Sequence, residues 1–139
     1  MIFDKTFSHI GIHDRTIVCE ENNRKYIANN INNSIVYSFK IDGEIIKNSL
    51  QKRCDYLVEN ETSKNAFFVE LKGVDIAAAF LQLRETIILF ADKLSEYKIH
   101  SRVVCSRVST HSVNGSEYRK LLKECSDIRF RSRQFEENI

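Results

Sequence analysis

The chain has no proline, no tryptophan, a single methionine and only four glycines among its 139 residues. Without proline and without low-complexity runs, it lacks the composition of a flexible linker. The scattered glycines cannot form a glycine-rich phosphate loop, which argues against chemistry driven by nucleotide hydrolysis. The longest apolar run lies within an amphipathic helical pattern and is too short for a membrane span.

The cysteines and histidines also lack the spacing of metal and redox motifs. The four cysteines form no CxxC pair and no zinc-like set, and no signal peptide precedes them. The four histidines form neither HxH nor HExxH, so the sequence does not indicate a histidine metal site or a Cys/His nucleophile pair. We therefore expect free thiols in a reducing, cytoplasmic compartment. The cysteines are Cys19, Cys54, Cys105 and Cys125.

The chain does contain enough apolar material for one core. Hydrophobic residues make up 42% and charged residues 29% of the 139 positions, so we expect a single domain spanning residues 1–139. The net charge of +2 is uneven, because residues 98–139 hold nine Lys/Arg against five Asp/Glu, and residues 1–97 hold twelve against fourteen. The basic part could meet phosphates while the acidic part holds a metal, although a solvated polar face explains the charges equally well.

Hydrophobic periodicity predicts an α/β domain. Residues 75–97 show the clearest pattern, an apolar stripe at helical spacing that follows Asp75, a suitable N-cap. The strand after this helix should lie parallel to its neighbour, since a crossover helix joins them. Asp42 and Gly43 predict a hairpin turn. The other expected elements are a weak helix at 14–28 that ends in an Asn-rich turn, strands at 34–41, 52–58, 66–72, 99–108 and 127–135, a return strand starting at 44–47, and a short helix at 115–124.

Two of these strands each carry an acidic residue. Asp55 lies in KRCDYLV, and Glu70 and Lys72 lie in AFFVELKG. Residues two apart on a strand point to the same face, so Glu70 and Lys72 should project together. The apolar residues around Glu70 predict a central strand buried on both faces, where a charge needs a partner or a metal. A solvated Glu–Lys pair on an exposed strand is the alternative interpretation.

Two carboxylates and a lysine form a minimal set for hydrolysing a phosphodiester. Mg²⁺ usually takes one or two carboxylates together with waters and substrate oxygens. The cation lowers the pKa of a coordinated water and neutralises developing charge. A nearby lysine can orient or deprotonate the attacking water. Asp55, Glu70 and Lys72 are therefore candidate catalytic residues.

Residues 35–108 resemble the PD-(D/E)xK nuclease superfamily, which has the restriction-endonuclease-like fold. The resemblance lies in CDYLV, the polar turn ENETSKN, FFVELKG and the helix that follows. It implies a mixed central sheet with an αβββαβ core flanked by helices. It also implies that Asp55 and Glu70 are metal ligands with the Leu71 carbonyl as a third, and that Lys72 is the catalytic lysine. Cys54 is a departure, because it stands where the family's name-giving proline would be.

The same resemblance implies a function. The protein would be a Mg²⁺-dependent nuclease, with Mn²⁺ as a substitute, that cuts nucleic acid, in the first place DNA, in prokaryotic or phage restriction, repair, recombination or defence. A homodimer is expected, because one small domain covers one strand of a duplex and twofold symmetry is the commonest assembly. Two alternatives stay open: a noncatalytic nucleic-acid-binding or assembly module of this fold, and a toxin or effector nuclease controlled by a regulatory protein partner.

Further candidates lie on the long helix and near the C-terminus. Gln82 lies on the flank of the apolar stripe and resembles the helix-borne glutamine that supports the site in many members of the superfamily, although an ordinary exposed residue would look the same. Arg129, Arg131 and Arg133 alternate along the last expected strand and should share one face. They could grip a phosphate backbone. Equally, they could protect a sheet edge from aggregation.

Overall fold

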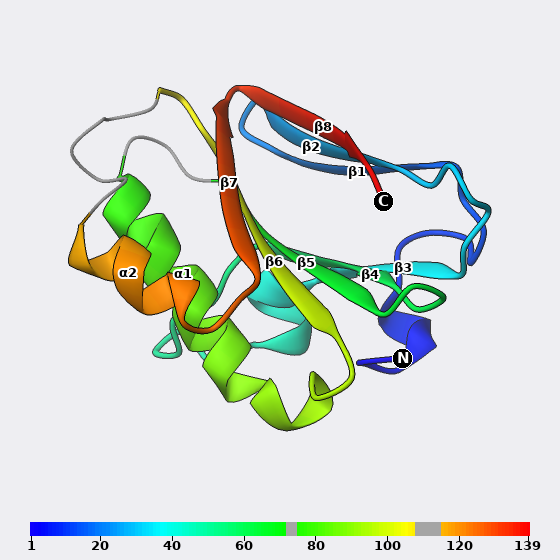
Figure 1. Cartoon of the computed structure of the whole chain (residues 1–139), viewed down its shortest axis with the longest axis horizontal. Helices are drawn as coiled ribbons and strands as arrows, with labels where there is room; N and C mark the ends of the chain where they lie inside the picture. Colours follow the sequence, from blue (N-terminus) through cyan, green and yellow to red (C-terminus); the bar gives the residue numbers. More distant parts are fainter. Residues whose placement is uncertain (72–74, 108–114) are drawn as a thin grey trace.

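The computed structural model describes residues 1–71, 75–107 and 115–139, which form three layers (Figure 1). Two helices cover one face of a five-stranded sheet, and a three-stranded sheet covers the other face. The strands are β1 (Thr16–Glu21), β2 (Arg24–Asn29), β3 (Val36–Lys40), β4 (Tyr56–Asn60), β5 (Asn65–Leu71), β6 (Lys98–Cys105), β7 (Asp127–Ser132) and β8 (Gln134–Asn138). The helices are α1 (Ile76–Leu89) and α2 (Ser116–Leu122), with short turns η1 (Lys5–Phe7), η2 (Ile41–Ile45) and η3 (Ala91–Lys93).

Both sheets are mixed, so the predicted α/β class is confirmed. The five-stranded sheet has the order β3-β4-β5-β6-β7, in which β3, β4 and β5 run antiparallel and β5, β6 and β7 run parallel. The helix α1 crosses over from β5 to β6, and the predicted parallel pairing of these strands is correct. In the smaller sheet, β1 pairs antiparallel with β2, and β2 pairs parallel with β8.

Strand β5 is central and buried on both faces, as its apolar residues predicted. Ala66 and Phe68 face the core beneath the helices, together with Phe80 and Leu83 of α1. Alternate residues of β5 face a second core between the two sheets, where Tyr26 of β2 lies. A strand with apolar residues on both faces buries both sets of side chains only at the centre of such a three-layer arrangement.

The weak helix predicted at 14–28 is wrong, and with it the leading helix of the expected core. These residues form the hairpin of β1 and β2. Asn22 and Asn23 make its two-residue turn, with φ angles of 50° and 65°. Asparagine tolerates this left-handed backbone, and two such residues in succession give the turn that matches the twist of paired strands.

Three further elements differ from the predictions. The strand predicted at 52–58 begins only at Tyr56, so Asp55 directly precedes β4 and does not lie in it. Residues 44–47 form no return strand. Ile41–Ile46 instead closes on itself, with Gly43 at a φ of 92° and the Ile46 amide donating to the Ile41 carbonyl. The strand predicted at 127–135 divides at Arg133, whose φ of 67° turns the chain from β7 into β8 of the other sheet. The alternation of arginines at 127–135 continues through Arg133, so it could not reveal that the two parts of this segment belong to different sheets.

Helix α1 begins as predicted but is shorter than its apolar stripe. The Asp75 carboxylate accepts a hydrogen bond from the Ala78 amide at 2.9 Å and so caps the helix. The helix ends at Leu89, and the chain then forms η3, so Leu94 contributes to the core from outside the helix. In the described part of the chain, no helix has both the length and the apolarity needed to cross a membrane.

Candidate active site

The two predicted metal-binding carboxylates come together where β4 and β5 reach one edge of the larger sheet. Asp55 directly precedes β4, and Glu70 is the last residue but one of β5. Tyr56 pairs with Val69, so Asp55 and Glu70 are opposite each other in the antiparallel register. Asp55 is 9% exposed and Glu70 3%. Carboxylates buried this far need hydrogen bonds or a cation.

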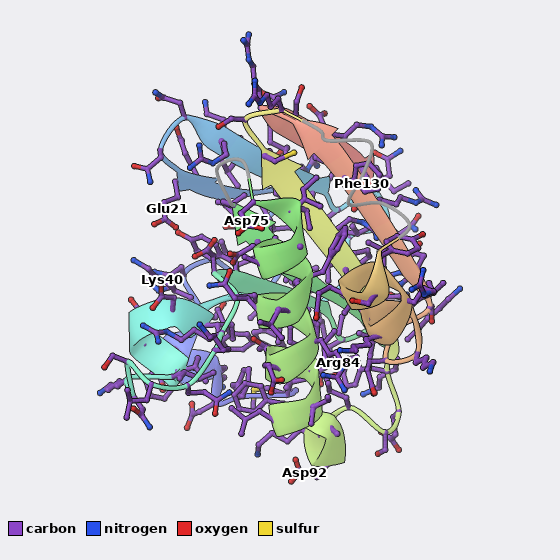
Figure 2. All side chains as sticks on the ribbon, turned by 90° about the vertical axis from the view of Figure 1, so that its left-hand side faces the viewer. Glu21, Lys40, Asp75, Arg84, Asp92 and Phe130 are labelled. Atoms are coloured by element: carbon purple, nitrogen blue, oxygen red, sulfur yellow. The ribbon has the colours of Figure 1, made fainter. Side chains whose placement is uncertain are left out.

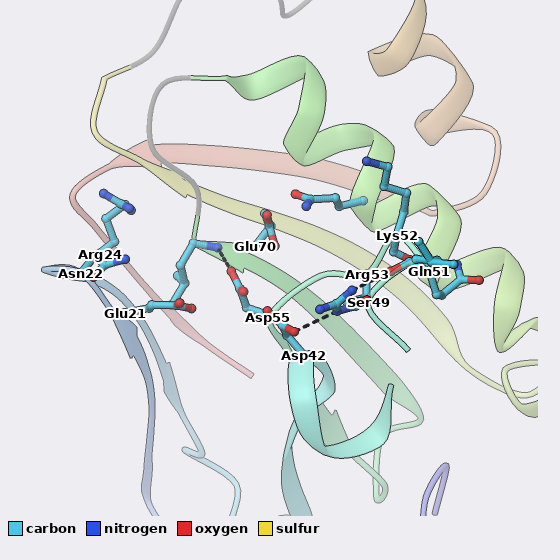
Figure 3. A pocket seen from close by; sticks show the side chains of 13 residues that line it. Glu21, Asn22, Arg24, Asp42, Ser49, Gln51, Lys52, Arg53, Asp55 and Glu70 are labelled. Carbon is cyan, nitrogen blue, oxygen red and sulfur yellow. Dashed lines mark hydrogen bonds and ion pairs between the residues drawn. The ribbon is translucent and has the colours of Figure 1, made fainter. Parts of the chain in front are cut away.

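Asp55 is held in place by several backbone contacts. Its Oδ2 accepts a hydrogen bond from the Leu71 amide at 2.8 Å (Figure 3). Its own amide donates to the Val69 carbonyl at 3.1 Å, and its carbonyl accepts from the Ile41 amide at 2.8 Å. These contacts leave Asp55 with one carboxylate oxygen, Oδ1, that the Leu71 amide does not occupy.

Helix α1 is tied to the same place through Thr86. The Thr86 hydroxyl donates to the Gln82 carbonyl at 2.7 Å and accepts from the Cys54 amide at 2.8 Å. Gln82 itself lines the site, and its Oε1 is buried without a hydrogen-bond partner among the described residues. The predicted proximity of Gln82 to the carboxylates is therefore found, and its amide is placed to hydrogen-bond a molecule in the pocket.

A pocket of about 420 Å³ opens beside these groups. Figure 3 shows Asp55 and Glu70 between two walls. One wall is the β1–β2 hairpin, and the other is formed by residues 49–53, which include Lys52 and Arg53. Arg53 is fixed there, because its Nε donates to Asp42 Oδ1 at 2.8 Å.

The hairpin supplies three pocket residues, Glu21, Asn22 and Arg24, that the sequence analysis does not identify. The sequence predicts a helix at these positions, and such a helix has no evident connection with Asp55. The two successive asparagines, Asn22 and Asn23, between the segments TIVCEE and RKYIAN are the signal that could have identified the hairpin. In Figure 2, Glu21 and Asp75 lie near the same end of the molecule, while Asp92 lies at the opposite end of α1.

Glu21 adds negative charge to the site. Burial raises the pKa of this carboxyl above its ordinary value, and the charge of Asp55 and a hydrogen bond shared with Asp55 raise it further. Lys40 acts in the opposite direction and lowers the pKa. The raised pKa of Glu21 therefore reflects its burial first and the neighbouring Asp55 carboxyl second.

Not every predicted site residue lies at this pocket. Lys72 lies outside the described residues. Arg129 and Arg131 are exposed on β7, where Arg129 pairs with Asp127 at 3.6 Å and Arg131 lies over the ring of Phe135. Arg133 lies beyond the end of β7, so the prediction that all three arginines share one strand face is wrong for Arg133.

The donor set suits a hard cation held by few protein ligands. Among the described residues, no group of three or more His, Cys, Asp and Glu side chains is arranged to hold a metal ion. Asp55 and Glu70 alone match the needs of Mg²⁺, which retains several waters and takes one or two carboxylates. Leu71 also lines the pocket, and its carbonyl stays the predicted third oxygen ligand. A site made only of oxygen donors fits Mg²⁺ or Mn²⁺ better than zinc.

Comparisons of the chain with protein-family models, with curated proteins and with solved structures found no match.

Proposed function

We propose that this protein is a Mg²⁺-dependent nuclease that hydrolyses phosphodiester bonds of nucleic acid, in the first place DNA. The observation that carries the proposal is the meeting of two buried carboxylates, Asp55 and Glu70, at a pocket whose walls bear Arg24, Lys52 and Arg53. Carboxylates alone would repel a phosphate. Cationic walls around an acidic centre suit a phosphodiester that reaches a bound cation.

Each residue has a defined part in this chemistry. Asp55 and Glu70 would hold Mg²⁺, which supplies charge neutralisation and a more acidic coordinated water. Lys72, two residues after Glu70, would orient or deprotonate the attacking water. Gln82 would hydrogen-bond the substrate or a water through its amide. Arg24 and Arg53 would bind phosphate oxygens and position the scissile bond.

We also infer a variant of the restriction-endonuclease-like core. Support comes from the order β3, β4, β5, α1 and β6, which follows the βββαβ part of that core, with three antiparallel strands, a crossover helix and a parallel strand. In this chain the β1–β2 hairpin precedes the core in the place of the first helix, and it brings Glu21 to the pocket.

The decisive experiment measures cation-dependent cleavage of labelled duplex DNA, single-stranded DNA and RNA. We expect cleavage with Mg²⁺ or Mn²⁺ that EDTA abolishes. Asp55→Asn and Glu70→Gln should each abolish it while the thermal midpoint holds or rises, because the substitution relieves carboxylate repulsion. Asp92→Asn is the control, since Asp92 is exposed in η3 at the far end of α1.

Two results would contradict the proposal. Cleavage at the wild-type rate by Asp55→Asn or Glu70→Gln would refute the assignment of the site. A wild-type protein that cleaves none of the three substrates with either cation would refute the proposed activity. Binding without cleavage would favour the noncatalytic module of the same fold.

A further inference from the structure

The C-terminal ends of the three parallel strands meet the β1–β2 hairpin at one edge of the molecule (Figure 1). The Arg133 amide, between β7 and β8, donates to the Cys105 carbonyl at the end of β6 at 2.8 Å. The Arg133 carbonyl accepts from the Lys25 amide of β2 at 3.0 Å. Three segments far apart in the sequence are thus joined into one continuous edge beside the pocket.

This edge carries four arginines, which we call the arginine rim: Arg24, Arg107, Arg131 and Arg133. Arg24 begins the rim, because it lines the pocket and its Nη1 donates to Ser106 Oγ at the end of β6 at 3.1 Å. Arg107 follows Ser106 directly and is exposed, as are Arg131 and Arg133. The rim therefore runs from the pocket, past β6, to the junction of β7 and β8.

Within the described part of the chain, the rim arginines differ from the neighbouring cations in having no acidic partner. Lys25 pairs with Glu20 at 3.9 Å, and Arg129 pairs with Asp127 at 3.6 Å. Among the described residues, none of the four rim arginines forms an ion pair. Arg24 donates to Ser106, and Arg131 donates from Nη1 to the Phe130 carbonyl at 2.9 Å and lies over the Phe135 ring. These partners are neutral, and a guanidinium has five N–H donors, so each of these arginines keeps donors for a phosphate.

We propose that the arginine rim binds the sugar–phosphate backbone of a nucleic-acid strand as it leaves the pocket. This inference rests on the proposed nuclease function, and it names the path of the substrate. Strands in a sheet lie about 4.8 Å apart, so the path from β5 to β7 covers ~10 Å. A B-form strand advances about 3.4 Å per phosphate, so the rim would contact about three phosphates on one side of the cleaved bond.

The test compares two triple variants of equal charge. The rim variant carries Arg107→Gln, Arg131→Gln and Arg133→Gln, with Arg24 unchanged because it lines the pocket. The control variant carries Lys93→Gln, Lys98→Gln and Lys123→Gln, which are exposed near the edge where β6 and β7 begin. Binding of fluorescein-labelled single-stranded and duplex DNA is titrated at several salt concentrations in EDTA, which prevents cleavage.

We expect the slope of log affinity against log salt to fall by about 2 for single strands or nearly 3 for a duplex in the rim variant, at ~0.7 and ~0.9 per lost contact. The control variant should keep the wild-type slope. The rim proposal would be refuted by an unchanged slope in the rim variant or by an equal decrease of the slope in both variants. It would also be refuted if the wild-type protein bound no DNA. Cleavage by the wild-type protein is measured separately. If the rim variant loses salt dependence but the wild type does not cleave, the nuclease proposal fails and the rim proposal stands. If the wild type cleaves but the rim variant keeps the wild-type slope, the rim proposal fails and the nuclease proposal stands.

Discussion

At the scale of single residues, the site combines a firmly held carboxylate with cations that surround it. Asp55 is bonded through its amide, its carbonyl and its side chain to two other segments of the chain. A ligand fixed in this way loses little entropy when a cation or substrate arrives, and such preorganisation is what electrostatic catalysis requires. Arg53, held by Asp42, is fixed in the same manner.

Lys72 provides the test of the chemistry itself. If it orients or deprotonates water, Lys72→Ala should lower the cleavage rate by ~10² or more, while Mn²⁺ affinity measured by calorimetry stays close to wild type. Lys98→Ala, an exposed lysine at the start of β6, is the matched control and should cleave normally. Wild-type rates in Lys72→Ala would show that this lysine takes no part in the reaction.

At the scale of elements, the packing of α1 determines where Asp55 sits. Thr86 is fully buried, and its hydroxyl accepts the only hydrogen bond recorded for the Cys54 amide among the described residues. Cys54 precedes Asp55, so this contact anchors the chain immediately before the carboxylate that we propose as a metal ligand. The helix thus contributes to the site through a threonine that faces the sheet, in addition to Gln82.

Replacing Thr86 by valine tests this anchor. Thr86→Val keeps the shape but leaves the Cys54 amide buried without an acceptor, which should lower the free energy of unfolding by about 1–3 kcal/mol. Activity should fall as well, because Asp55 loses its positioning. Thr62→Val is the control: its hydroxyl accepts from the Ile35 amide at 2.8 Å at an exposed position, where water can replace it. Urea denaturation measures both variants, and equal losses would contradict the anchor.

At the scale of the whole molecule, an ion-pair network holds the two sheets together. Arg102 of β6 is 2% exposed, and its Nε lies 2.6 Å from Glu137 Oε2 of β8. Its Nη1 lies 3.0 Å from Asp127 Oδ1 of β7. A buried guanidinium requires such partners, since desolvation is costly when either is lost. These ion pairs link β6 to both β7 and β8, and so tie the larger sheet to the smaller one.

This network predicts how the fold responds to acid. Burial alone would raise the pKa of Asp127, but hydrogen bonds from Arg102 and His100 outweigh it and hold the pKa below its ordinary value of 3.8. A lowered carboxyl pKa contributes stability that is present above the unfolded pKa and is lost as pH falls through the folded one. Thermal midpoints measured from pH 6 to pH 2 should therefore converge for wild type and Asp127→Asn below about pH 3.8. A constant difference across this range would contradict the assignment.

The sequence by itself determined the elements whose signal is local. The stripe and N-cap of α1 and the doubly buried strand β5 follow from side-chain periodicity and spacing, which act within a few residues. That Asp55 and Glu70 lie opposite each other follows from the register of β4 and β5, which the structure supplies. Free thiols were also predicted, and all four cysteines are free in the structure.

Only the tertiary structure decided which distant segments share the site and the edge. Glu21 and Arg24 reach the pocket because the second sheet packs over the first, and Arg133 leaves the face of Arg129 because the chain crosses between sheets there. Residues 14–28 carry apolar side chains that are compatible with a helix or with a hairpin. They form the hairpin because its apolar side chains cover the second face of β5, which would otherwise be exposed to water. Burial of that face is a property of the whole chain, so no local window of sequence contains it.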